Sequence, residues 1–167
     1  DSGSIVIVND TVDASFSDTS DMTIINGFAS GEYFGSSLAY AGDINDDGKG
    51  DILVAALQNQ GLTVNEGAAY LIYGNSDMSN ADVIAITGGE SDYLGSAIAS
   101  GDDINGDGID DLLVAAYRED FTDSSNQIIL NVGAAYVFYG PVIQDISAVD
   151  ADQIIYGEAT SDQLGYS

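Results

Sequence analysis

The chain repeats itself, and this internal repeat constrains the fold more than any other feature of the sequence. Residues 34–39 (Phe-Gly-Ser-Ser-Leu-Ala) are matched by residues 94–99 (Leu-Gly-Ser-Ala-Ile-Ala), and residues 164–167 (Leu-Gly-Tyr-Ser) begin a third copy. Residues 67–74 are matched in the same way by residues 133–140. Matched positions lie 60 to 70 residues apart, and the extra length falls in loops, so the predicted strands form a constant frame.

Two acidic loops of one pattern lie within the repeats. Residues 43–51 read Asp-Ile-Asn-Asp-Asp-Gly-Lys-Gly-Asp, and residues 103–111 read Asp-Ile-Asn-Gly-Asp-Gly-Ile-Asp-Asp. Side-chain oxygens at positions 1, 3, 5 and 9, a turn-forming Gly at position 6 and a carbonyl at position 7 suit a loop that wraps a hard cation. Without a cation, the crowded carboxylates would repel one another. The predicted ligands are Asp43, Asn45, Asp47, Asp51 and the backbone carbonyl of Lys49, and then Asp103, Asn105, Asp107, Asp111 and the backbone carbonyl of Ile109.

Calcium is the cation that we expect in both loops. The ligands are all oxygens, the chain has no Cys or His for a softer metal, and Mg²⁺ tends to keep its own waters. An EF-hand or dockerin-type loop is the alternative, but both need an acidic ligand at position 12, where this chain has Val54 and Val114. The short apolar runs at 52–56 and 112–116 favour a buried strand over an exit helix.

Each repeat is predicted to contain four strands, with the acidic loop between the first and the second. The strands are expected at about 36–41, 51–56, 67–73 and 82–87, and again at about 96–101, 111–116, 133–139 and 152–156. Residues 4–8 and 22–25 fit the third and fourth strands of a preceding unit. Because both faces of strand 69–73 are apolar, we expect small sheets stacked face to face, as in a propeller or an open array of blades.

The charge of the chain is extreme. Against 28 Asp and Glu residues stand only Lys49 and Arg118, which gives a net charge of −26. Such a surface repels nucleic acid and anionic membranes, and it attracts cations or basic partners. A hydrophobic content of 45% is enough for a core, so this is not a disordered acidic tail. A salt-adapted protein would share this composition.

Two features of the sequence bear on localisation. No apolar run approaches the roughly 20 residues of a transmembrane helix, and we expect no signal peptide within these residues. The weaker class of calcium site fills only at the millimolar concentrations found outside cells, so we expect an extracellular or cell-surface protein.

Phe34-Gly35, the two acidic loops and Gly67-Ala68-Ala69 together resemble the FG-GAP repeat, the unit of the β-propeller in integrin α subunits and in many bacterial secreted proteins. The resemblance covers nearly the whole chain, although Leu94 and Leu164 replace the name-giving Phe. It implies an all-β fold of four-stranded antiparallel blades, about two and a half blades of a propeller or open array, with calcium in the loops. The implied divisions are residues 1–33 (second half of a blade), 34–93 and 94–163 (full blades) and 164–167 (start of the next).

The resemblance implies a non-enzymatic, calcium-stabilised structural or adhesive module. Two alternatives are a stretch of an extracellular filament built from such blades and an accessory propeller of a secreted hydrolase. The absence of His and Cys excludes a Ser or Cys nucleophile activated by His within this chain, whereas a carboxylate pair for glycoside hydrolysis stays possible. Two or three blades do not close a ring, so the expected partners are further blades or neighbouring copies, together with a protein or glycan ligand.

Other motifs have simpler interpretations. Asp13, Ser15 and Ser17 match the core of the metal-ion-dependent adhesion site of inserted integrin domains, but without its buried parallel strand we favour a polar loop. Lys49-Gly50-Asp51 spells an integrin-ligand tripeptide whose Asp is already assigned to calcium, and Asn9-Asp10-Thr11 is a glycosylation sequon. For the aromatic residues near blade junctions, packing is preferred over a binding surface: Tyr33, Tyr93, Tyr117 and Phe121.

Overall fold

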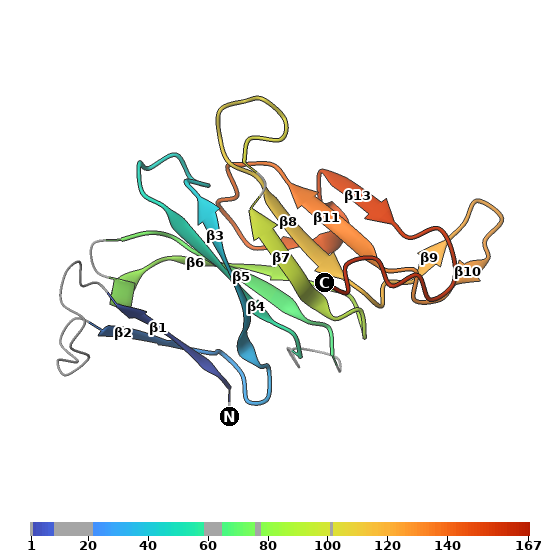
Figure 1. Ribbon diagram of the computed structural model, residues 1–167, viewed down its shortest axis with the longest axis horizontal. Coiled ribbons are helices and arrows are strands. Elements are labelled where there is room, and N and C mark those ends of the chain that lie inside the picture. The colour runs from blue at the N-terminus through green and yellow to red at the C-terminus, as the bar shows by residue number, and fades with distance from the viewer. Residues whose placement is uncertain (1, 9–21, 59–64, 76–77, 101) are drawn as a thin grey trace.

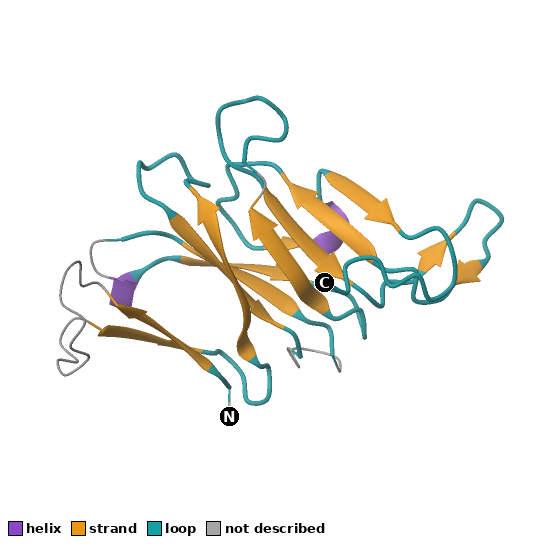
Figure 2. Cartoon of the chain, in the orientation of Figure 1, coloured by secondary structure: helices purple, strands orange, loops and turns teal. Residues whose placement is uncertain are grey.

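The computed structural model describes residues 2–8, 22–58, 65–75, 78–100 and 102–167, and these residues form an all-β chain (Figure 2). Its helical content in these ranges is limited to two single-turn 3₁₀ helices, η1 (Met78–Asn80) and η2 (Ala148–Asp150). The strands are arranged in separate open sheets, and the described residues do not close a barrel (Figure 1). The expected all-β fold class is therefore confirmed.

The first blade is a sheet of five strands in the order β12-β6-β5-β4-β3. Neighbouring strands are antiparallel, except that β12 runs parallel to β6. The predicted succession of four strands is thus observed, and β12 is an addition to it. The bounds are β3 (Phe34–Gly42), β4 (Asp51–Ala56), β5 (Ala68–Ile72), β6 (Val83–Thr87) and β12 (Ile146–Ser147).

The second blade is an antiparallel sheet of four strands in the order β13-β11-β8-β7. Its strands are β7 (Leu94–Ser100), β8 (Leu112–Ala116), β11 (Ala134–Phe138) and β13 (Gln153–Tyr156). Two antiparallel pairs complete the fold: β1 (Ser4–Val8) with β2 (Met22–Asn26), and β9 (Phe121–Thr122) with β10 (Ile128–Ile129). The main strands begin and end within two residues of the predicted bounds, whereas β9, β10 and β12 were not predicted.

The Phe-Gly and Leu-Gly steps that begin the two full repeats each produce a β-bulge. Gly35 has a φ of 87° and Gly95 a φ of 88°, in the left-handed region that favours glycine. The pairing of β3 with β4 shifts register between Phe34 and Ser37, and β7 shifts against β8 in the same place. A Cβ atom on Gly95 would lie 2.8 Å from the carbonyl oxygen of Ala68, so the backbones also approach closely there.

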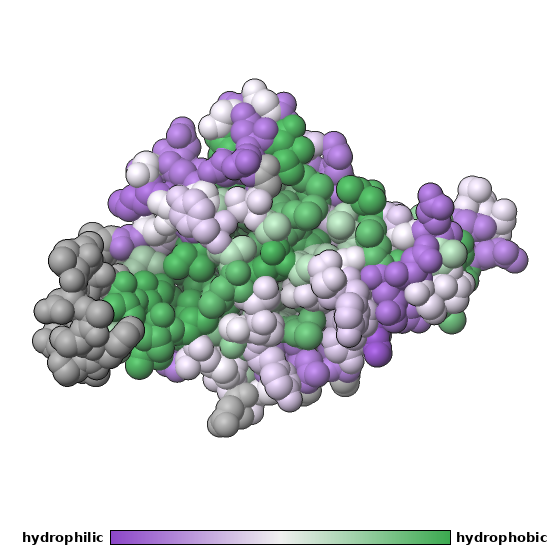
Figure 3. All heavy atoms as spheres, in the orientation of Figure 1, coloured by the Kyte–Doolittle hydropathy of each residue, from purple (hydrophilic) through white to green (hydrophobic). Residues whose placement is uncertain are grey.

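Two apolar cores lie on the two sides of the first blade. One is shared with the second blade and includes Leu53, Leu71 and Leu112, and the other is shared with β1 and includes Ile5 and Phe34. All five residues of β5 are buried, which confirms that this strand is apolar on both faces. Figure 3 shows apolar residues gathered across the middle of the visible face, with hydrophilic residues on the loops above it.

One backbone hydrogen bond recurs at each step from unit to unit. The N–H groups of Phe34, Leu94 and Leu164 donate to carbonyl oxygens of the preceding unit, each at 3.0 Å. The acceptors are Ser2, Glu66 and Val132. Because the bond repeats, neighbouring units are stacked in the same way along the chain.

Candidate metal centre

The two acidic loops lie at the same edge of the molecule. The first joins β3 to β4 and the second joins β7 to β8, as the spacing predicted (Figure 1). Most of their residues are exposed, in contrast to the buried strands that follow them. Each hairpin therefore presents its polar loop at one rim of the stacked blades.

In the first loop the side chains bind the backbone of their own turn. Asp43 accepts hydrogen bonds from the N–H of Asp47 at Oδ1 (2.9 Å) and from the N–H of Gly48 at Oδ2 (2.8 Å). Asn45 Oδ1 accepts from the same Asp47 N–H at 3.1 Å. Oxygens from positions 1 and 3 thus converge on the N–H of position 5, inside the turn.

The second loop has the same network at the same positions. Asp103 accepts from the N–H of Asp107 at 2.9 Å and from that of Gly108 at 2.8 Å. Asn105 Oδ1 accepts from the Asp107 N–H at 2.8 Å. The two loops therefore share one conformation although their sequences differ at positions 4, 7 and 8.

Position 7 contributes its N–H to this network. The N–H of Lys49 donates to Asp47 Oδ1 and that of Ile109 to Asp107 Oδ1, both at 2.9 Å. The ammonium group of Lys49 lies 3.0 Å from Asp47 Oδ2, and this bond is the main cause of a lowered pKa of the Asp47 carboxyl. At the corresponding place in the second loop, the amide of Asn105 donates to Asp107 Oδ2 at 2.9 Å.

The Asp at position 9 is buried at the base of each loop. Asp51 and Asp111 are both inaccessible to solvent, and each uses both carboxylate oxygens as acceptors. Asp111 accepts from the N–H of Ile104 at 2.7 Å and from that of Gly140 at 3.0 Å. Burial raises the pKa of the Asp51 carboxyl, while the backbone N–H donors of Gly74 and Ile44 oppose that rise. These two Asp residues join their loops to the ends of β5 and β11.

The chemistry of these donors suits a hard cation. Each loop supplies carboxylate, amide and carbonyl oxygens, and positions 1, 3 and 5 are brought together around one turn. Among the described residues, no three His, Cys, Asp or Glu side chains form a group that could hold a metal ion. The predicted calcium ligand sets, which include Asn45, Asn105 and backbone carbonyls, therefore stay a prediction.

One set of acids that the sequence motifs did not single out has a repeated structural role. An acid stands two residues before the Phe-Gly or Leu-Gly pair in all three copies, which is the signal that would have found it. Each accepts backbone N–H groups of the turn that precedes the pair. These acids are Glu32, Asp92 and Asp162, and their backbone donors are Phe28, Gly89, Glu158 and Ala159.

One of these acids bonds a buried tyrosine of the third strand directly, and another is connected to the equivalent tyrosine through Glu119. In the first blade, the hydroxyl of Tyr70 donates to Glu32 Oε2 at 3.4 Å. In the second blade, Asp92 is one methylene shorter, and Glu119 hydrogen-bonds both Asp92 and Tyr136. Burial and the neighbouring Glu119 raise the pKa of Asp92 to about 8 and hold the pKa of Tyr136 well above its usual range.

Three of the four aromatic candidates pack against other aromatic rings. Tyr93 and Tyr117 have ring centroids 5.4 Å apart, and the guanidinium of Arg118 lies over both rings, at 4.9 and 5.4 Å. Phe121 packs against Tyr156 with a centroid distance of 4.8 Å. Tyr33 remains 59% exposed.

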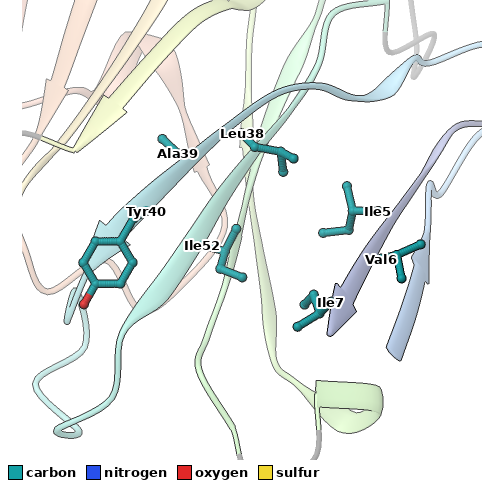
Figure 4. Close-up of a pocket in the computed structure, with 7 residues that line it drawn as sticks. All are labelled: Ile5, Val6, Ile7, Leu38, Ala39, Tyr40 and Ile52. Carbon is teal, nitrogen blue, oxygen red and sulfur yellow. The ribbon is translucent and has the colours of Figure 1, made fainter. Parts of the chain in front are cut away.

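An apolar groove of about 360 Å³ lies between β1 and the strands β3 and β4 (Figure 4). It is lined by three consecutive residues of β1, three of β3 and Ile52 of β4. Among the described residues of its lining, the hydroxyl of Tyr40 is the only side-chain polar group. The groove can bury apolar surface, but its described lining holds no acid or base for catalysis.

The remaining motifs have simple outcomes. Asp51 is buried with both oxygens bonded, so the Lys49-Gly50-Asp51 tripeptide is not free to act as an integrin ligand. Asp13, Ser15 and Ser17 and the sequon at residues 9–11 lie outside the described residues. In the part of the chain that the structure describes, no helix has the length and apolar character needed to cross a membrane.

Comparison with known proteins identifies the repeat. Residues 94–138 match the family model described as FG-GAP repeat. The chain is 36% identical to integrin alpha pat-2 of Caenorhabditis briggsae over 91 residues, which are 51% of this chain and 7% of that protein. It is 33% identical to integrin alpha-D of Homo sapiens over 111 residues, which are 63% of this chain and 9% of that protein. The chain thus spans less than a tenth of these relatives; it contains an FG-GAP repeat at residues 94–138 and is similar in sequence to integrin α subunits.

Proposed function

We propose that this chain is a calcium-stabilised module of FG-GAP blades in an extracellular adhesive or structural protein, and that it has no enzymatic activity of its own. The observation that carries the proposal is the set of hydrogen bonds among positions 1, 3 and 5 that the two acidic loops share. Loops that differ at positions 4, 7 and 8 but keep one conformation indicate a common requirement at positions 1, 3, 5 and 9. A bound cation is such a requirement.

Calcium supplies positive charge at the point where each hairpin concentrates its acids. The first ion would be held by Asp43, Asn45, Asp47, Asp51 and the carbonyl of Lys49. The second would be held by Asp103, Asn105, Asp107, Asp111 and the carbonyl of Ile109. In both loops the cation would offset carboxylate repulsion and fix the hairpin between the first two strands, so folding and calcium supply become linked.

Similarity to integrin α subunits supports an adhesive role at or outside the cell surface. A protein or glycan surface is the kind of ligand that such a role implies. The strongly acidic chain favours basic partners and, at millimolar extracellular calcium, occupied loops.

The outward face of the second blade supports further blades, or neighbouring copies of this chain, as structural partners. Ile44 and Ile86 of the first blade are completely buried against the second blade. The corresponding residues of the second blade, Ile104 and Ile155, are each 51% exposed. A blade with the same repeat would bury them in the same way.

Thermal unfolding with and without calcium tests the proposal. At free calcium 100-fold above the dissociation constant, one site contributes about 2.7 kcal/mol. For a chain of 167 residues this corresponds to a Tm increase of about 5 to 10 °C. An excess of chelator should remove the increase, and titration calorimetry should detect two sites.

Matched variants separate calcium binding from a general effect of charge. Asp43→Asn with Asp47→Asn should abolish the first site, and Asp103→Asn with Asp107→Asn the second. Asp150→Asn together with Glu158→Gln removes two exposed charges away from the loops and should leave both sites intact. A wild-type Tm that is the same in calcium and in chelator would rule out the proposed role.

A further inference from the structure

Asp110 is an acid of the second loop whose carboxylate reaches the first loop. It occupies position 8, outside the pattern of ligand positions. Its Oδ2 accepts a hydrogen bond at 3.0 Å from the backbone N–H of Asp43, which is position 1 of the first loop. A single carboxylate thus connects the two candidate metal loops across the interface between blades.

The first loop is shaped to receive this carboxylate. Gly42, next to Asp43, has a φ of 75°, and a Cβ atom there would lie 1.8 Å from Asp110 Oδ2. Any side chain at position 42 would therefore displace the carboxylate. The first loop makes no equivalent contact from its own position 8, because that residue is Gly50. A Cβ atom on Gly50 would lie 2.5 Å from the ring of Tyr40.

The charge of Asp110 gives this contact a dependence on cations. The first loop already contains Asp43, Asp46, Asp47 and Asp51, so the approach of a fifth carboxylate is unfavourable when the loop holds no cation. A divalent cation bound through Asp43 reduces that repulsion, and it acts close to Asp110 because Asp110 is bonded to the backbone of the same residue.

The contact lies within a packed interface, so a change at the loops is passed to the blades. Ile44, the neighbour of Asp43, is completely buried in the core that the two blades share. The hydroxyl of Tyr73 donates to the carbonyl of Val142, and β12 pairs with β6, so other contacts hold the blades together. Asp110 therefore changes the stability of an interface that other contacts also hold together.

We propose that Asp110 is a positioning residue that couples the cation site of the first loop to the docking of the second blade. The inference rests on the proposed calcium function. Calcium in the first loop strengthens the contact between the blades, and by linkage the docked Asp110 strengthens calcium binding by the first loop. The same residue has no comparable role in its own loop, where Asp103 and Asp107 make the turn.

Calorimetric calcium titrations of the full chain test the coupling. Asp110→Asn keeps an oxygen acceptor for the Asp43 N–H but removes the charge. In a chain whose second site is disabled by Asp103→Asn and Asp107→Asn, Asp110→Asn should weaken calcium binding by about fivefold or more. In a chain whose first site is disabled by Asp43→Asn and Asp47→Asn, it should change binding less than twofold. Asp150→Asn is the matched control for the loss of one exposed charge.

Two results overturn the coupling. One is an equal effect of Asp110→Asn in both backgrounds, or an effect no larger than that of Asp150→Asn. The second result comes from thermal unfolding in chelator. Asp110→Ala leaves the Asp43 N–H without its acceptor, so its Tm should be lower than that of Asp110→Asn. Equal Tm values would mean that this hydrogen bond does not stabilise the contact between the blades. If the wild-type chain binds no calcium, both the calcium function and the coupling are wrong. The Tm comparison in chelator then still shows whether the bond between Asp110 and Asp43 stabilises the contact between the blades. If it binds calcium but Asp110→Asn has no selective effect, only the coupling fails.

Discussion

Asp51 joins the first acidic loop to the end of β5, because its Oδ1 accepts a hydrogen bond from the N–H of Gly74 at 2.7 Å. Its other oxygen accepts from the N–H of Ile44 at 2.9 Å, and the side chain is completely buried. Asp111 makes the same pair of bonds in the second blade. In both blades, therefore, the Asp at position 9 connects its loop to the end of the third strand through buried hydrogen bonds.

Replacing Asp51 should destabilise the fold even without calcium. Asp51→Asn turns an NH₂ group toward one of two backbone N–H donors, and one buried N–H loses its acceptor. We expect a loss of about 1 to 3 kcal/mol in the free energy of unfolding, measured by denaturant titration in chelator. Asp46→Asn, an exposed acid of the same loop, should change it by less than about 0.5 kcal/mol. Equal effects of the two substitutions would contradict the structural role of Asp51.

Stability should fall with rising pH because of Asp92. Its pKa in the folded chain is raised to about 8 by burial and by Glu119, against about 3.9 for an unperturbed Asp. The folded state therefore binds the Asp92 proton more tightly than the unfolded state does. The contribution of this proton to the free energy of unfolding is fully present below about pH 4, and it is lost as the pH rises through about 8.

Asp92→Asn should reduce this slope. After allowance for solvent screening, we expect the pH-dependent stability that it removes between pH 5 and 8 to be about 1 to 2 kcal/mol. Unfolding is measured in chelator, so that calcium binding does not contribute. Asp162→Asn changes the corresponding exposed acid of the third copy and should leave the slope as it is. A wild-type slope that persists in Asp92→Asn would show that its source lies elsewhere.

The bond between Tyr70 and Glu32 should contribute to the core between β1 and the first blade. Tyr70→Phe leaves the buried carboxyl of Glu32 without this donor, and we expect a loss of about 1 to 3 kcal/mol by chemical denaturation. The matched control is Tyr40→Phe, because the Tyr40 side chain is 71% exposed. A smaller loss for Tyr70→Phe than for the control would not be compatible with the bond.

The two equivalent isoleucines of the acidic loops should respond differently to truncation. Ile44→Ala removes a buried side chain between the blades and should cost about 2 to 4 kcal/mol. Ile104→Ala removes a half-exposed side chain and should cost less than about 0.5 kcal/mol in this chain. In a longer chain with a further blade on this face, the two costs should become similar, and a difference that persists there would argue against stacking on this face.

The sequence predicts the main strands well because their patterning is local. Apolar runs such as Leu53-Val54-Ala55-Ala56, followed by turn residues, determine where β4 and β8 lie. Gly35 and Gly95 mark the bulges. The repeated Asp-x-Asn-x-Asp-Gly spacing also predicts how positions 1, 3 and 5 of each loop come together, since those contacts lie within five residues of one another.

Contacts between distant residues could not be predicted in this way. The bond between Asp43 and Asp110 spans 67 residues, and nothing in either loop alone indicates it. The proximity of Asp92 to Glu119 depends on how the turn before β7 meets the loop after β8. β12 is two residues long and carries no strand pattern, so its pairing with β6 follows from packing alone.

β12 also changes what counts as one unit of this protein. By sequence it belongs to the repeat that begins at Leu94, but by hydrogen bonding it is the edge strand of the first blade, where Asp145 also accepts from the N–H of Ala85 at 2.8 Å. The repeat read from the sequence and the sheet formed in space therefore overlap. A fragment ending at Tyr93 would lose a strand of its own sheet, so single repeats excised at the sequence boundary should unfold less cooperatively than pairs.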